Sequence, residues 1–154
     1  MKSIQNWLEE YSVSHQNQTN KFIHWVCVPL IFFSITGLFY SIELPFKIGG
    51  EMNFNLAIVM SIGATLYYLF LSRTLWIGML IFSSLCMLVC YAIRQAGIPL
   101  PALCAVIFIL AWIGQFYGHH VEGKKPSFIH DLQFLMIGPA WLMGFIYKRF
   151  GIPY

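Results

Sequence analysis

The chain has 154 residues, of which 58% are hydrophobic and only 10% are charged. So few polar side chains cannot cover a water-soluble globule of this size, and the composition is typical of an integral membrane protein. The formal net charge of +3 reflects nine basic and six acidic residues, and the basic residues form no Lys/Arg-rich block, which argues against nucleic acid as a partner.

Residues 1–21 form the one sizeable polar segment of the sequence. Its apolar residues Ile4, Trp7, Leu8 and Tyr11 recur at three- and four-residue spacing, which predicts a short amphipathic helix at the membrane interface. The segment SVSHQNQTN that follows is rich in turn and capping residues. We therefore expect the chain to bend there before the next helix begins.

Five apolar runs follow and predict an all-α fold, a helical membrane bundle over residues 22–147 within a single domain, 1–154. The runs cover residues 22–42, 56–72, 75–93, 100–119 and 132–147. The first four approach the ~20 residues that are needed to cross a bilayer. The fifth is shorter and contains Gly138-Pro139, so it is compatible with a kinked, tilted or re-entrant helix as well as with a straight one.

The four cysteines lie inside these runs and lack the spacing of a metal site or a disulfide framework. We interpret them as small buried hydrophobic residues. They are Cys27, Cys86, Cys90 and Cys104.

The histidines are the main indication of chemistry. If each run crosses the membrane once, the start of the first run and the end of the fourth lie on one face, together with all five histidines. His24 lies at the mouth of a long apolar helix, where an unpaired imidazole is costly, and His15 precedes it across the predicted bend. If the fourth helix continues far enough, Gln115, His119 and Glu122 share one of its faces.

Two further histidines do not fit this cluster. His120 points about 100° away from His119 on the same helix, and we interpret both it and His130 as residues that hydrogen-bond at the headgroup level. Three neutral imidazoles, from His15, His24 and His119, would suit a first-row transition metal. The residues that could support them, or add a ligand, are Glu122, Asn20 and Gln115.

The spacing alone leaves other classes open. A bis-histidine b-type haem protein could use His24 and His119 as axial ligands. A non-enzymatic membrane subunit would bind no redox metal. Spacing also does not distinguish iron from zinc.

Several residues follow one another in an order that is typical of one family. They are Tyr11, His15, Asn20 and His24 near the N-terminus, and Gln115, Gly118, His119 and Glu122 at the end of the fourth run. In this order they resemble the membrane family of 2-hydroxy fatty acid dioxygenases. The resemblance extends over nearly the whole chain.

This resemblance implies an Fe(II)-dependent enzyme that uses O2 to shorten a 2-hydroxy fatty acid by one carbon, with the substrate entering from membrane lipid. It implies that His15, His24 and His119 bind the iron. The residues expected to orient the imidazoles or the substrate are Glu122, Asn20 and Gln115. A bacterial inner membrane and an endoplasmic reticulum membrane make the same demands on such helices, and the sequence indicates no oligomeric state.

Overall fold

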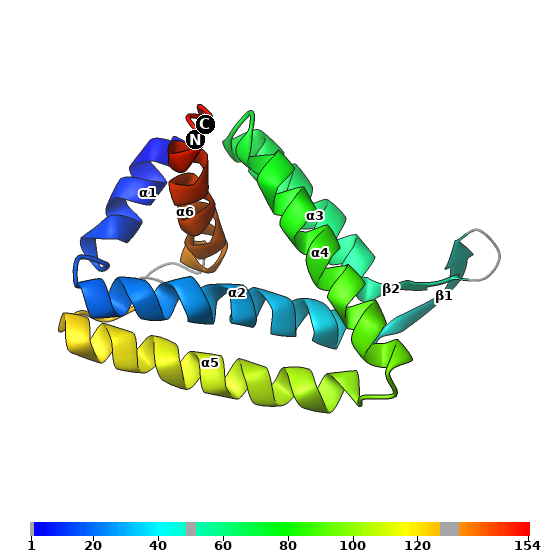
Figure 1. Cartoon of the computed structure of the whole chain (residues 1–154). Helices are drawn as coiled ribbons and strands as arrows, with labels where there is room; N and C mark the ends of the chain where they lie inside the picture. Colours follow the sequence, from blue (N-terminus) through cyan, green and yellow to red (C-terminus); the bar gives the residue numbers. More distant parts are fainter. Residues whose placement is uncertain (1, 49–51, 127–132) are drawn as a thin grey trace.

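The computed structural model describes residues 2–48, 52–126 and 133–154. This part of the chain contains six helices and one antiparallel hairpin (Figure 1). In chain order these are α1 (Ile4–Val13), α2 (Gln18–Tyr40), β1 (Glu43–Ile48), β2 (Met52–Asn55), α3 (Leu56–Leu71), α4 (Leu75–Gln95), α5 (Leu100–Glu122) and α6 (Phe134–Arg149). The predicted all-α fold is confirmed, and the short hairpin is an addition that the apolar runs did not predict.

Local capping explains where the first two helices begin. The Ser3 side chain accepts a hydrogen bond from the Asn6 amide at the start of α1, and the Asn17 side chain accepts from Thr19 and Asn20 at the start of α2. These side chains satisfy amide groups that have no partner within the helix. The predicted bend is therefore present between α1 and α2.

Helices α2 and α5 lie side by side and run in opposite directions (Figure 1). Small residues permit this close approach. A Cβ atom added at Gly114 would lie 2.7 Å from the Sγ atom of Cys27, and one added at Gly37 would overlap the Sγ atom of Cys104. All four cysteines are buried and none forms a disulfide, which agrees with their interpretation as packing residues.

The remaining helices lie on the side of α2 that faces away from α5. Figure 1 shows α6, with α1 beside it, and the α3–α4 pair rising from α2 and diverging from each other. The Tyr68 hydroxyl of α3 donates a hydrogen bond of 2.6 Å to the Met136 carbonyl of α6. At the other end of α6, the Tyr147 hydroxyl donates to the Thr74 carbonyl at 2.9 Å. These bonds fix α6 against both α3 and α4.

Three of the described helices, α2, α4 and α5, are long and apolar enough to cross a membrane. Helix α3 has only 16 residues, fewer than the ~20 of a typical span, and α6 continues as one helix through Pro139. Helices α2 and α5 pack antiparallel, so the start of α2 lies next to the end of α5. This proximity does not depend on how many of the intervening helices cross the membrane.

The tight contact between α2 and α5 gives a stability prediction. We expect Gly114→Ala to reduce stability by about 1–3 kcal/mol, because the added methyl group would force Cys27 aside in a packed interface. The matched control is Gly63→Ala, since nothing lies within 4 Å of a Cβ atom at that position of α3.

Thermal unfolding of the purified protein in detergent measures the difference between these variants. Adding Cys27→Ala to Gly114→Ala should recover part of the lost stability, because it removes the clashing Sγ atom. Equal melting temperatures for Gly114→Ala and Gly63→Ala would contradict a close contact between the helices.

Candidate metal centre

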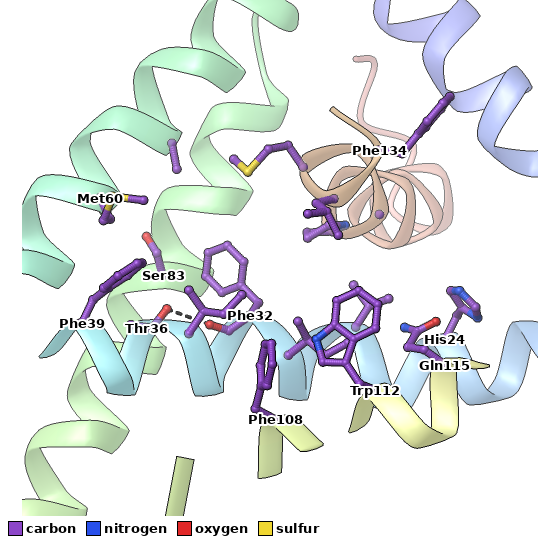
Figure 2. Close-up of a pocket in the computed structure, with 18 of the residues that line it drawn as sticks. His24, Phe32, Thr36, Phe39, Met60, Ser83, Phe108, Trp112, Gln115 and Phe134 are labelled. Atoms are coloured by element: carbon purple, nitrogen blue, oxygen red, sulfur yellow. Dashed lines mark hydrogen bonds between the residues drawn. The ribbon is translucent and has the colours of Figure 1, made fainter. Parts of the chain in front are cut away.

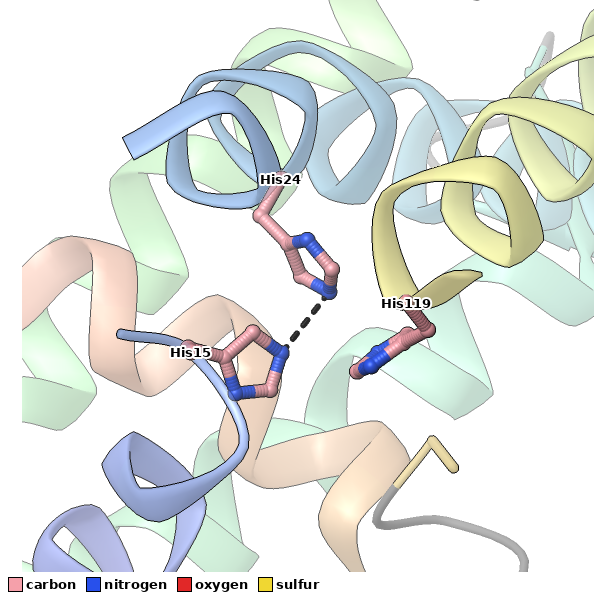
Figure 3. A group of neighbouring side chains, drawn as sticks. All are labelled: His15, His24 and His119. Carbon is pink, nitrogen blue, oxygen red and sulfur yellow. Dashed lines mark hydrogen bonds between the residues drawn. The ribbon is translucent and has the colours of Figure 1, made fainter. Parts of the chain in front are cut away.

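Three histidines from separate parts of the chain meet at one point (Figure 3). His15 lies in the link between α1 and α2, His24 in the second turn of α2, and His119 in the last turn of α5. One ring nitrogen from each histidine lies within 4.8 Å of the others. The three side chains are 0%, 1% and 5% exposed, so they form a buried cluster.

Backbone carbonyls orient two of these rings. The Nδ1–H of His15 donates to the Tyr11 carbonyl at 2.6 Å, and that of His24 donates to the Asn20 carbonyl at 3.0 Å. A carbonyl oxygen only accepts, so each ring is protonated at Nδ1 and presents the Nε2 lone pair. Metal-binding histidines are commonly held in this way.

The two Nε2 atoms of His15 and His24 lie 2.9 Å apart. With both Nδ1 atoms protonated, two lone pairs face each other, and a cation between them is required for a favourable contact. Burial lowers the pKa of His15 to about 4, which disfavours a shared proton at neutral pH. The geometry therefore suits a metal ion.

His119 would be the third ligand of such an ion. Within the described residues its Nδ1 atom is buried and has no hydrogen-bond partner, which is an unfavourable state for a polar atom unless a ligand is bound. Two nitrogens that bind one ion at ~2.0–2.1 Å lie ~3–4 Å apart. The observed separations reach that range after side-chain shifts of about 1 Å.

Aromatic side chains form a wall beside His15. The Tyr11 ring stacks on the His15 ring, with centroids 4.1 Å apart, and the Trp141 ring lies 5.3 Å from the same imidazole. Burial raises the pKa of the Tyr11 phenol well above its ordinary value, so this group stays neutral. Tyr11 was not among the predicted site residues, although its position four residues before His15 places it one helical turn away.

The carboxylate of Glu122 joins the end of α5 to the bend before α2. It accepts hydrogen bonds from the backbone amides of Gln16 and Asn17, each at 2.8 Å, and from the Asn20 side chain at 3.0 Å. Asn20 is completely buried, and its side chain also donates to the Ser14 carbonyl at 3.2 Å. Glu122 thus holds the backbone that carries His15 instead of contacting an imidazole.

The other residues singled out in the sequence differ in where they lie relative to the three histidines. Gln115 is buried and lies one turn before His119 on the same side of α5, which confirms that this helix continues through the site. His120 is exposed and outside the cluster, as its helical position predicted. His130 lies outside the residues that the structure describes.

An apolar cavity of about 360 Å³ begins at the histidines (Figure 2). His24, His119 and Gln115 line one end of it, and the remaining wall is almost entirely apolar. Ligand pockets of this size commonly combine an apolar wall with a few polar groups that fix the orientation of the ligand.

The arrangement favours a single ion over a haem. Two axial ligands of a haem lie on opposite faces of a macrocycle. The ring centroids of His24 and His119 are only 5.0 Å apart, and His15 lies within 4.9 Å of both. No space remains between these rings for a porphyrin.

Comparison with known proteins assigns the family. The profile of the 2-hydroxy-palmitic acid dioxygenase Mpo1-like family matches residues 1–150 of the chain. The chain belongs to this family. The matched region includes the three clustered histidines and Glu122, so the whole of the candidate site lies within it.

A curated member of the Mpo1-like group agrees with this assignment. The chain is 28% identical to 2-hydroxy-palmitic acid dioxygenase MPO1 of Saccharomyces cerevisiae over 156 residues, which cover 97% of this chain and 83% of the yeast protein. The similarity is therefore not confined to one motif. No solved structure matches the chain.

Proposed function

We propose that the protein is an Fe(II)-dependent membrane dioxygenase that uses O2 to shorten 2-hydroxy fatty acids by one carbon. The observation that carries this proposal is that the Nε2 atoms of His15 and His24 face each other at the end of an apolar cavity, beside the Nδ1 atom of His119, which has no hydrogen-bond partner among the described residues. Family membership supports the reaction class, and the geometry supports the binding of a metal.

His15, His24 and His119 would hold the ion. Three neutral imidazoles leave coordination positions open, as non-haem iron oxygenases require. Ferrous iron would supply the one-electron chemistry that O2 needs in order to react with an organic acid. The buried Tyr11 and Trp141 rings keep bulk water away from His15.

The cavity would be the binding site of the substrate. A 2-hydroxy acid has a polar head with two adjacent oxygen functions and a long apolar chain, which matches a space that is polar at the histidines and apolar elsewhere. The Gln115 amide lines the polar end near His24 (Figure 2). It offers both a donor and an acceptor to the head of the substrate. Membrane lipid would supply the substrate to the apolar helices.

Glu122 and Asn20 act in this proposal as positioning residues. Glu122 fixes the amides next to His15, and the Asn20 carbonyl orients His24. Neither residue lines the cavity, so they would set the geometry of the site without touching the reacting atoms.

The proposal predicts metal-dependent turnover. Protein purified without oxygen should contain about one iron per chain, and it should consume O2 and convert 2-hydroxypalmitate into an acid one carbon shorter. Elemental analysis, an oxygen electrode and mass spectrometry of the product measure these three quantities. Removal of the metal with a chelator should stop the reaction, and Fe(II) should restore it.

Palmitate without the 2-hydroxyl group is the matched substrate control and should not be shortened. Two results would refute the proposal: full turnover in metal-free protein, or restoration by Zn(II) as complete as that by Fe(II). A haem absorption band in the purified protein would instead select the cytochrome class.

A further inference from the structure

We propose that the far end of the cavity sets the greatest length of alkyl chain that the enzyme accepts, with Ala57 and Phe39 as the residues that determine this limit. This inference rests on the proposed function and adds the substrate range of the same site. It depends on three features of the cavity: its direction, its length and the way in which it ends.

The cavity follows one face of α2 away from the histidines. The α2 residues that line it recur at three- and four-residue spacing, which places them on one side of the helix. They are His24, Val28, Ile31, Phe32, Ile35, Thr36 and Phe39. In Figure 2 the labelled members extend from His24 to Phe39, with Trp112 and Phe108 of α5 along the same side. An alkyl chain that starts at the histidines would therefore lie parallel to α2.

The length of this face corresponds to a long-chain acid. His24 and Phe39 are separated by fifteen positions of α2, or ~22 Å at the helical rise of ~1.5 Å per residue. An extended alkyl chain advances ~1.25 Å per carbon–carbon bond, from a bond of ~1.5 Å and an angle of ~111°. This face of α2 thus has the length of an extended chain of about 18 carbons.

Two buried residues line the far end, beside the exposed Met60 (Figure 2). Ala57 at the start of α3 and Ser83 of α4 are 2% and 4% exposed, and Phe39 is half-buried beside them. The Ser83 hydroxyl donates to the Leu80 carbonyl at 3.0 Å and lies 2.9 Å from the Ser61 hydroxyl. These hydroxyl groups are satisfied by one another and by the backbone, so they require no water, and this end can hold a methyl group.

Discrimination between alkyl chains of different lengths would arise because the cavity excludes chains that are too long. A chain that comes from lipid gains little by entering an equally apolar cavity. A chain that is too long must instead displace packed side chains, which typically reduces binding or rate by about 5- to 150-fold. Chains shorter than the limit should be turned over at similar rates.

Two substitutions move the end of the cavity in opposite directions. Ala57→Leu fills it and should shorten the longest accepted chain by roughly two carbons, with kcat/KM for the longest good substrate of the wild type falling by about 5- to 150-fold. Phe39→Ala enlarges it and should extend the limit. Gly63→Leu is the control, on the open side of the same helix α3, and should not change the profile. Turnover of a series of 2-hydroxy acids from 10 to about 24 carbons, a range that brackets the cavity length, measures the limit.

A second measurement needs no turnover. Bromine quenches tryptophan fluorescence on contact, and Trp112 lines the cavity partway along its length. Without oxygen, a 2-hydroxy acid brominated in mid-chain should quench the wild type more than one brominated at the terminal methyl group. Trp112→Phe should remove most of that difference.

These measurements separate the two proposals. Absence of turnover for every chain length, with quenching intact, would overturn the proposed reaction and leave the chain-binding cavity in place. Turnover with the same length limit in the wild type, Ala57→Leu and Phe39→Ala would overturn the inference, provided that the variants keep the wild-type melting temperature and metal content. If Ala57→Leu does not fold, Phe39→Ala and the quenching pattern still decide.

Discussion

Replacing His24 with alanine is expected to abolish both iron binding and turnover. The His24 Nε2 atom lies 2.9 Å from that of His15, and its removal leaves too few imidazoles to hold an ion. A residue that only orients a ligand typically changes metal affinity or activity by about 10–100-fold, so loss of the ligand itself should exceed that range. His15→Ala and His119→Ala should behave in the same way.

The control for these variants is His120→Ala, which changes an exposed histidine next to His119 on α5. It should retain most of its iron and activity. A readout independent of catalysis is the rise in melting temperature on adding Fe(II), because a ligand that binds only the folded state stabilises it. This rise should occur for the wild type and His120→Ala and disappear for the three cluster variants. A rise in His24→Ala as large as that of the wild type would rule out the assigned ligand set.

Glu122→Gln is expected to reduce activity at limiting iron by about 10–100-fold without removing any ligand. The carboxylate accepts two backbone hydrogen bonds at 2.8 Å and one from Asn20 at 3.0 Å. Hydrogen bonds to a charged acceptor contribute about 1.5–3 kcal/mol each, whereas those to a neutral group contribute about 0.5–1.5 kcal/mol. The neutral amide should therefore loosen the backbone that carries His15.

The dependence of turnover on iron concentration distinguishes positioning from ligation. Excess Fe(II) should largely restore Glu122→Gln, because all three imidazoles remain, but it should not restore His24→Ala. Glu9→Gln, which neutralises an exposed carboxylate on α1, is the matched control and should resemble the wild type. If Glu122→Gln stays inactive at every iron concentration, the carboxylate has a role beyond positioning.

Much of the fold follows from the sequence because apolar segments of this length satisfy their backbone hydrogen bonds as helices. The amphipathic spacing of Ile4, Leu8 and Tyr11 predicted helix α1, and in the structure these three residues pack in the protein core with residues of α6. The helical face shared by Gln115 and His119 is also present, since α5 continues to Glu122. The hairpin of β1 and β2 was not predicted, because two short strands between apolar runs carry no strong pattern.

The sequence by itself therefore determined the helices, and it identified the three histidines through their order in the chain and the resemblance that this order carries. Only the tertiary structure decided how the imidazoles face one another, because ring orientation depends on the backbone carbonyls of Tyr11 and Asn20. Every residue has a backbone carbonyl, so the sequence does not indicate which carbonyl binds a ring. It also decided that Glu122 binds backbone amides at the bend before α2. The cavity could not be predicted either, since its walls come from helices distant in sequence, and its shape depends on how α6 and the α3–α4 pair diverge above α2.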